Sequence, residues 1–263
     1  MICGTENRGF KKMKRSCAFF ILLLGAMTLY GDPKHPVSQA QIVVEQEYDD
    51  AKTRYETNQA DSVAAWQFAR ACFEVADLAD KDSERARLGH EGSEVCEQVL
   101  KRDPNIAAAH YYLGMNIGQV AQTKSLGALP LVRQMRKEWE TAQALDEHLD
   151  FAGPDRNLGM LYRDAPGPPL SVGSRSQALQ HMARAVELAP DYPENRLNLI
   201  ESQIKWNRME DAARENETLR AILPAARKEL TGPHWQGPWK DWEARRADID
   251  LKLSEWRRRH SQP

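Results

Sequence analysis

The sequence predicts an all-α fold built as a solenoid of stacked helix-turn-helix units. Helical spacing of apolar residues dominates residues 37–230, and nothing there reads as a convincing strand. Pro154, Pro190 and Pro224 each follow an Ala-rich helical stretch, at spacings of 36 and 34 residues. At the shorter spacing, Ala178, Met182, Ala185 and Pro190 align with Ala212, Asn216, Leu219 and Pro224. Because a unit of this length cannot bury its own apolar face, neighbouring units must stack on one another.

Residues 1–31 are predicted to be a secretory signal peptide or an N-terminal anchor. Five basic residues between Arg8 and Arg15 precede an apolar run from Ser16 to Tyr30. This run suits a signal peptide better than a membrane span, which needs about 20 apolar residues. The cleavage site is poor, so an uncleaved tether through residues 16–30 remains an alternative, and Met13 is an alternative start to Met1. We therefore expect an exported protein, either released or anchored to the membrane.

The charge and the cysteines limit the function classes. The formal net charge is −2, and removing the five basic residues and one acidic residue of the leader makes it −6. A nucleic-acid partner is therefore not expected, because it would need a basic face. Cys72 and Cys96 remain after the leader. They fall at similar heights of a predicted helical hairpin, so they form either a disulfide or two small buried apolar contacts.

The elements follow one another in a regular order. An amphipathic helix is expected over residues 38–57, and Asp61 or Ser62 caps the next helix. Its return helix starts near Ser83 and ends before Pro104. Further helix pairs continue to residue 230, and breakers near Gly232 precede a C-terminal helix within residues 231–263. That helix should cap the last unit by packing one of its faces against it. The residues of this face are Trp239, Trp242, Arg246, Ile249, Leu253 and Trp256.

The residue types at corresponding positions of these units resemble the tetratricopeptide repeat (TPR) family. Its unit of about 34 residues consists of two helices. The first helix carries a large residue, an apolar–Gly pair and an aromatic residue. The second helix carries Ala, a large residue and Ala, and a Pro follows it. The matching positions are Trp66, Ala69, Arg70 and Phe73 with Gly92, Cys96, Val99 and Pro104; His110, Leu113, Gly114 and Ile117 with Ala142, Asp146, Leu149 and Pro154; a short helix near Asn157–Arg163 with Ala178, Met182, Ala185 and Pro190; and Arg196, Leu199, Ile200 and Gln203 with Ala212, Asn216, Leu219 and Pro224. The resemblance implies a TPR-like α-solenoid of about four units over residues 37–230.

Two insertions depart from the plain repeat. One covers residues 123–138, and the other, residues 165–174, is rich in Pro and Gly and predicts a stiff loop. This arrangement, with Leu158-Gly159, is similar to the T-components of TRAP transporters and to the regulators of microtubule dynamics. The first of these resemblances implies a periplasmic accessory to solute uptake that encloses a small apolar ligand.

The sequence predicts a binding protein without catalytic residues, metal ligands or a cofactor. The pair His90-Glu91 lacks the second histidine of a zinc helix. We expect a scaffold that binds a protein or peptide through its concave groove and its Pro-rich loop; the alternative is the solute-uptake accessory, and a hydrolase with unrecognised groups is a third class. The expected contact residues are Gln67, Tyr111, Met115, Gln119, Leu197, Glu201 and Lys205 in the groove and Pro168 and Leu170 in the loop.

Overall fold

A computed structural model describes residues 39–124 and 127–260, all of whose regular elements are helices. The predicted leader and tether within residues 1–31 lie outside the described residues. The helices are α1 (Gln39–Thr57), α2 (Ser62–Leu78), α3 (Asp82–Arg102), α4 (Ala107–Gln122), α5 (Ala128–Leu145), α6 (Leu149–Asp164), α7 (Arg175–Leu188), α8 (Pro193–Lys205), α9 (Met209–Glu229) and α10 (Pro233–His260).

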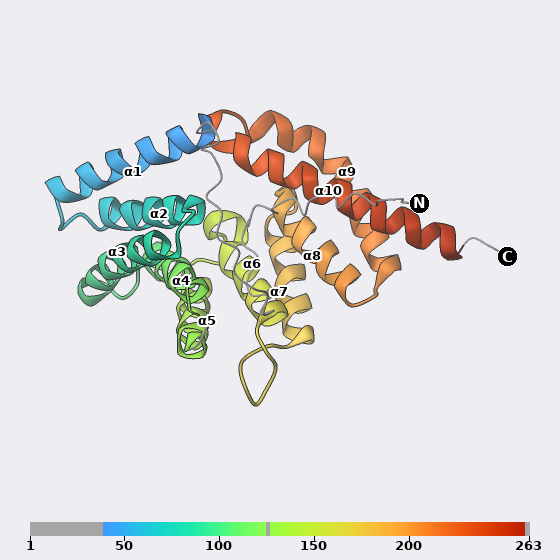
Figure 1. Cartoon of the computed structure of the whole chain (residues 1–263), viewed down its shortest axis with the longest axis horizontal. Helices are drawn as coiled ribbons and strands as arrows, with labels where there is room; N and C mark the ends of the chain where they lie inside the picture. Colours follow the sequence, from blue (N-terminus) through green and yellow to red (C-terminus); the bar gives the residue numbers. More distant parts are fainter. Residues whose placement is uncertain (1–38, 125–126, 261–263) are drawn as a thin grey trace, which may run out of the picture.

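Helices α2 to α9 form four successive helix-turn-helix pairs, which confirms the predicted solenoid (Figure 1). Among the described helices, the backbones of α2, α4, α6 and α8 approach one another in succession, whereas those of α3, α5, α7 and α9 lie farther apart. The first helices of the pairs therefore form the tight inner row, and the second helices spread apart on the outside. This difference in spacing gives the array its curvature.

Local sequence explains how the pairs begin and how closely they pack. As predicted, Asp61 caps α2, because its Oδ1 accepts hydrogen bonds from the backbone N–H groups of Val63 and Ala64 at 2.8 and 3.3 Å. Gly114 of α4 lies against the Trp139 indole of α5, where an added Cβ would lie 2.4 Å from Nε1. A glycine here lets the largest buried side chain of the second pair fit between its two helices.

Most of the predicted insertion at residues 123–138 is helical. Residues from Ala128 onward belong to α5, and the buried positions of that helix include Met135, Trp139 and Ala142. Met135, Trp139 and Ala142 take the places predicted for Ala142, Asp146 and Leu149, so the register of this helix lies seven residues earlier than predicted. Trp139 occupies the large-residue position of the second helix and lies against Gly114 of the first helix.

Two of the four prolines do not end helices as predicted. Pro154 lies near the start of the right-handed part of α6, where its missing N–H leaves no intrahelical bond unmade. Pro224 lies inside α9, which continues to Glu229. In contrast, Pro104 and Pro190 follow the ends of α3 and α7.

The C-terminal helix caps the last pair and also closes the array. Trp239, Trp242, Ile249 and Leu253 are buried against α8 and α9, as the predicted packing face requires. In addition, α10 contacts α1, so the first and last described helices meet (Figure 1). His234 joins them, with Nδ1 3.4 Å from Glu47 of α1 and Nε2 3.3 Å from the Arg70 guanidinium of α2. The repeat pattern did not predict this closure.

Of the two alternatives for Cys72 and Cys96, the structure has the unbonded one: both are free thiols buried in the core. Burial raises the pKa of each thiol, so both stay protonated at neutral pH. They fill the small apolar positions between α2 and α3, which is the other interpretation of the pair.

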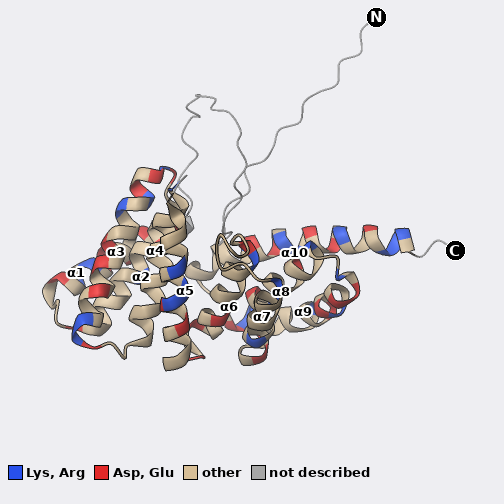
Figure 2. Ribbon diagram, turned by 90° about the horizontal axis from the view of Figure 1, so that it is seen from below, with Lys and Arg blue, Asp and Glu red and all other residues tan. Residues whose placement is uncertain are grey.

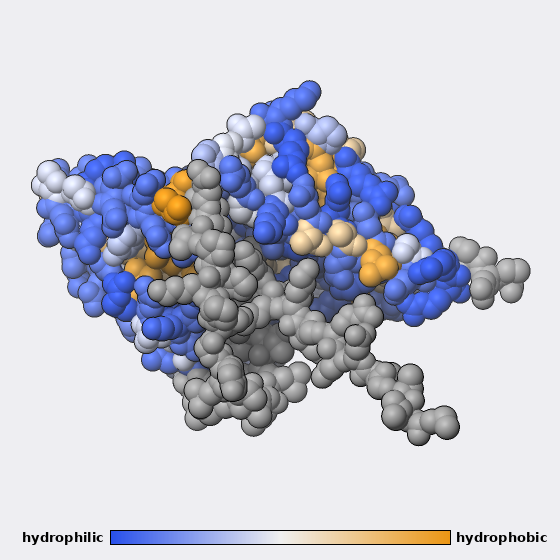
Figure 3. Space-filling view, turned by 45° about the horizontal axis from the view of Figure 1, so that its top comes forward, coloured by the Kyte–Doolittle hydropathy of each residue, from blue (hydrophilic) through white to orange (hydrophobic). Residues whose placement is uncertain are grey.

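Charge and hydropathy are evenly distributed over the visible faces. Basic and acidic residues alternate along α10 (Figure 2). The face in Figure 3 is mostly hydrophilic, with small separate apolar spots. No described helix has both the length and the apolar character needed to cross a bilayer.

Candidate functional site

Helix α6 begins with an unusual left-handed turn. Asp150, Phe151 and Ala152 have φ angles of 51, 55 and 61°, although none of them is glycine. For L-residues this conformation costs roughly 1–2 kcal/mol each. Three such residues in a row persist only where their surroundings hold them, and this kind of strain is typical of functional positions.

A buried polar network holds this turn in place. Arg156 donates from Nη2 to Asp150 Oδ2 at 2.6 Å and from Nη1 to the carbonyls of Asp150 and Phe151 at 3.0 and 3.2 Å. The Tyr111 hydroxyl donates to the same Asp150 oxygen at 2.6 Å, and Asn195 donates to the Phe151 carbonyl at 2.9 Å. Burial and the Asp150 carboxylate raise the pKa of Tyr111, so its hydroxyl remains a donor. Helices α4, α6 and α8 therefore fix the turn jointly.

The turn presents Phe151 to an aromatic group that spans the inner helices. Its ring stacks on Tyr192 with centroids 4.4 Å apart and meets the edge of Trp235 at 6.2 Å. Farther along, Trp66 of α2 stacks on Tyr112 of α4 at 5.8 Å. Phe151 is 40% exposed and Trp66 and Trp235 are half-buried, whereas both tyrosines are buried beneath them. We call these five residues the inner aromatic band.

Charged groups accompany the band. Arg70 lies between its two ends: it follows Trp66 by one helical turn and contacts His234, the neighbour of Trp235. Burial, with smaller contributions from the carboxylates of Glu194 and Asp241, raises the pKa of Asp77 to about 6. Asp77 on α2 therefore faces acidic groups of α8 and α10 across the inner side. Gln119 donates to Asp77 at 3.3 Å, which opposes this shift.

Arg245 of α10 partly neutralises this acidic side. Its guanidinium binds both carboxylate oxygens of Glu201 at 2.7 and 2.9 Å and donates to Asn198 at 2.6 Å. Such bidentate pairs are among the strong, directional ones. Glu201, a predicted contact residue, therefore forms an ion pair with Arg245 inside the protein.

Four other predicted groove residues are not available to a partner, and this correction changes the site. Tyr111, Met115, Gln119 and Leu197 are 1, 9, 1 and 1% exposed. Asn157 of α6 donates to both the Tyr111 hydroxyl and the Met115 sulfur, at 3.1 Å each. Contacts between neighbouring pairs therefore cover the face that the pattern assigned to the groove.

The predicted register of α2 is rotated about its axis. Trp66 and Arg70 were assigned to packing positions of the repeat, but both are half-buried on the inner side. Gln67 is half-buried as well, and Lys205 is exposed and pairs with Asp164 at 3.1 Å. The spacing of Trp66, Arg70, Phe73 and Asp77 carried the signal for the inner face, because these residues form one helical stripe.

The Pro-rich loop at residues 165–174 keeps its two predicted contact residues exposed. Backbone bonds close its neck, from Gly173 N–H to the Pro166 carbonyl and from Ser174 N–H to the Tyr162 carbonyl, both at 2.9 Å. An added Cβ at Gly173 would lie 2.0 Å from the Ala165 carbonyl oxygen. Leu170 is 67% exposed at the outer part of the loop, and Pro168 is exposed as well. The loop is a closed, shaped projection (Figure 1).

The stacked hairpins and the tight inner row define this chain as a TPR-like repeat protein. A family model described as regulator of microtubule dynamics protein 1-3 matches residues 36–151, somewhat less than half of the chain. Its match covers α1 to α5 and ends within the left-handed turn.

A solved structure shows the same fold over most of the chain. The TPR protein TTC0263 of Thermus thermophilus matches with a TM-score of 0.58 and 16% identity, covering 81% of this chain and 95% of that one. Yeast Tom70 matches with a TM-score of 0.28 and 10% identity, covering 81% of this chain and 60% of that one, too low for any structural argument. The curated protein sequences contain no significant match.

Proposed function

We propose that this chain is a scaffold that binds a segment of a partner protein along its inner aromatic band. Curved helical-repeat arrays generally bind along their concave side. The proposal rests mainly on one observation. The rings of Phe151, Trp66 and Trp235 are accessible to solvent, and each contacts a buried tyrosine. Rigidly supported Trp, Tyr and Arg side chains are the residue types that dominate protein interfaces.

Arg70 and the acidic groups of α2, α8 and α10 define what the partner should contain. Arg70 donates from Nε to Glu74 at 2.8 Å and keeps 40% of its side chain exposed, so its guanidinium plane can stack on an approaching group. Asp77, Glu194 and Asp241 give the neighbouring surface negative character. A partner segment with an aromatic or proline residue followed by a basic side chain would complement both features.

The Pro-rich loop would provide a second contact with the partner. Leu170 is an isolated apolar side chain on a backbone that is closed by its own hydrogen bonds. A rigid loop loses little conformational freedom on binding, which favours affinity.

We also propose that the protein acts outside the cytoplasm, in the periplasm. Support comes from the basic and then apolar sequence of residues 1–31. Fusion of residues 1–40 to a phosphatase that is active only after export tests this directly. A fusion without activity, beside an active positive control, would contradict export.

Site-specific photo-crosslinking tests the binding face. A photoreactive amino acid in place of Arg70 on the inner side should crosslink one defined partner from envelope extract. The same residue in place of Lys137, which is exposed on the outer helix α5, is the matched control. Equal crosslinking at both positions, or none at Arg70 while Lys137 reacts, would contradict the assigned face.

A further inference from the structure

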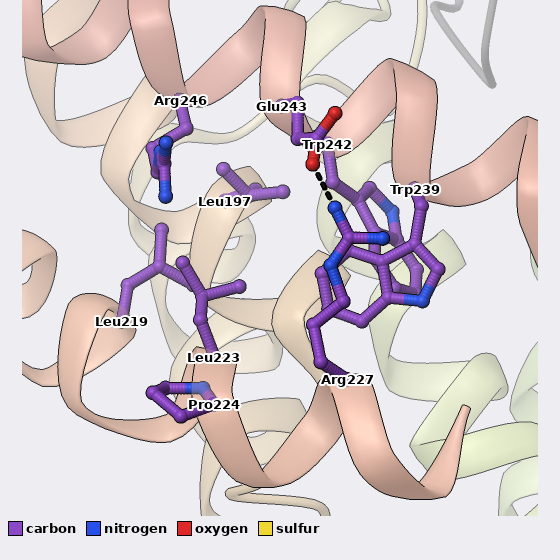
Figure 4. Close-up of a pocket in the computed structure, with 9 residues that line it drawn as sticks. All are labelled: Leu197, Leu219, Leu223, Pro224, Arg227, Trp239, Trp242, Glu243 and Arg246. Atoms are coloured by element: carbon purple, nitrogen blue, oxygen red, sulfur yellow. Dashed lines mark hydrogen bonds and ion pairs between the residues drawn. The ribbon is translucent and has the colours of Figure 1, made fainter. Parts of the chain in front are cut away.

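A pocket of about 240 Å³ lies between α8, α9 and α10 (Figure 4). One of its lining residues, Trp242, also contacts Tyr192 and Trp235 of the inner aromatic band, with ring centroids 5.5 and 6.0 Å apart. The walls of the pocket are mostly apolar. Leu197, Leu219 and Leu223 point toward one another, and the indoles of Trp239 and Trp242 lie at one side. The remaining lining residues are Pro224, Arg227, Glu243 and Arg246.

The size of this pocket limits what it can hold. A water molecule takes roughly 30 Å³ in the liquid, so the space accommodates about eight non-hydrogen atoms. An apolar lining with few charged groups is the usual composition of a small-molecule site. Leu197 and Leu219 are almost completely buried, whereas Pro224, Arg227 and Glu243 are exposed, so the pocket reaches from the interior to the surface.

Two of the three charged residues in the lining neutralise one another. Arg227 pairs with Glu243 and places its guanidinium 4.1 Å from the centre of the Trp239 ring. Figure 4 shows this pair at the side of the pocket opposite to Arg246. A ligand would gain little from either of these groups, because each already has its partner.

Arg246 is different, because it makes no hydrogen bond or ion pair with any described residue. Its Nε is buried without a partner. The nearby Asp250 carboxylate feels its charge, but the Asp250 Oδ1 atom accepts from Asn216 at 2.8 Å and from Arg220 at 2.7 Å. A half-buried guanidinium with unused donors therefore faces an apolar pocket. Guanidinium groups match carboxylates in geometry and charge.

We propose that this pocket binds a small monocarboxylic acid with an apolar body of about six carbons. The carboxylate accepts hydrogen bonds from Arg246, and the hydrocarbon part contacts the leucines and the indoles. Because Arg246 is the one charged lining residue without a partner among the described residues, it favours a ligand with a single negative charge. The pocket volume limits the hydrocarbon chain of that ligand to a short one. Arg246 is not part of the inner aromatic band, so its variants test this proposal separately from partner binding.

Titration with hexanoate tests the proposal, with ligand-observed NMR and calorimetry as readouts. We expect a dissociation constant of roughly 0.1–1 mM for a ligand of this size. Hexanol should bind at least about tenfold more weakly, because it lacks the charge that Arg246 recognises. Arg246→Gln should weaken hexanoate binding about tenfold or more and leave hexanol binding unchanged.

Two further variants make the test specific. Arg246→Lys keeps the charge and should retain part of the affinity, and Leu223→Trp should fill the pocket and abolish binding of both ligands. Arg214→Gln is the matched control, since Arg214 is an exposed arginine of α9 outside the pocket lining. Circular dichroism melts establish that each variant is folded.

Three results would overturn the proposal. They are no hexanoate binding at 10 mM, equal hexanoate binding by the wild type and the folded Arg246→Gln variant, and equal affinity for hexanoate and hexanol. The carboxylate could come from a free short-chain acid or from a peptide C-terminus. N-acetylleucine, which resembles a peptide C-terminus, distinguishes between them. Tighter binding of N-acetylleucine than of hexanoate would overturn the assignment to a free acid.

Discussion

Arg156 holds Asp150 with a 2.6 Å contact between Nη2 and Oδ2, and this pair fixes the left-handed turn at the start of α6. The guanidinium is almost fully buried, and it also satisfies the two carbonyls of the turn. One side chain thus compensates for backbone strain and positions Phe151 in the inner aromatic band.

Replacing Arg156 with methionine should therefore destabilise the protein by about 2–3 kcal/mol, because the two turn carbonyls and the half-buried Asp150 carboxylate would lose their donor. Urea denaturation measures this loss. Arg184→Met is the control: its guanidinium pairs with Glu147 and Glu187 on the surface, so we expect a change of at most about 1 kcal/mol. Similar losses in both variants would contradict the role of Arg156.

Ala152→Gly should be nearly neutral although Ala152 is buried. Glycine relieves the cost of a φ of 61° and offsets the lost methyl contact and the added chain freedom. Ala142→Gly in α5 removes the same buried methyl from a right-handed helix and should cost about 2 kcal/mol. Thermal melts compare the pair. A loss at Ala152 as large as that at Ala142 would show that the turn is not left-handed.

The neck of the Pro-rich loop should tolerate only glycine at residue 173. Gly173→Ala brings a Cβ within 2.0 Å of a backbone oxygen, so the neck must open or the protein must lose stability, by about 2 kcal/mol or more. At Gly167 an added Cβ would lie 3.7 Å from its nearest neighbour, so Gly167→Ala should change little. Limited proteolysis of the loop and thermal melts read out both effects. Equal behaviour of the two variants would argue against the closed neck.

Asp77 should make stability depend on pH on the acid side of neutrality. Its pKa is raised to about 6, so the folded state binds the proton more tightly than the unfolded chain does. The resulting stabilisation is present below the unfolded pKa of about 4 and is lost as the pH rises through about 6. Since 27% of the side chain is exposed, we expect about 1–2 kcal/mol. Asp77→Asn should remove this difference between pH 4.5 and 7.5 in urea titrations. An unchanged pH dependence would show that Asp77 is not the titrating group.

The repeat pattern predicted the fold well, because stacking leaves small and apolar residues at regular spacings. Ala178 with Met182 and Ala212 with Asn216 are buried at equivalent depths in α7 and α9, as their alignment predicts. The pattern failed at α5, where it placed the second-helix positions seven residues too late and assigned Trp139 to the vicinity of an insertion. The contact between Trp139 and Gly114, which fixes the correct register, is visible only when both helices are placed.

The site was harder to predict than the fold. Tyr111 lies on the inner row as expected, but its hydroxyl serves the Asp150 turn instead of a ligand. Nothing local in the sequence indicates that Asp150, Phe151 and Ala152 are left-handed, because Arg156 and Asn195 impose that conformation from α6 and α8. The contact between α1 and α10 likewise depends on how all four helix pairs together curve the array, which no local stretch of sequence reveals.

The affinity of the crosslinked partner for the Phe151→Ala variant tests the central claim most directly. Phe151 is 40% exposed on the inner aromatic band, and Leu251 is 55% exposed on α10 without being part of the band, so Leu251→Ala is the matched control. If the band binds the partner, calorimetry should show about a tenfold or greater loss for Phe151→Ala and less than about a twofold change for Leu251→Ala. Equal affinities of the wild type and a folded Phe151→Ala variant would contradict it.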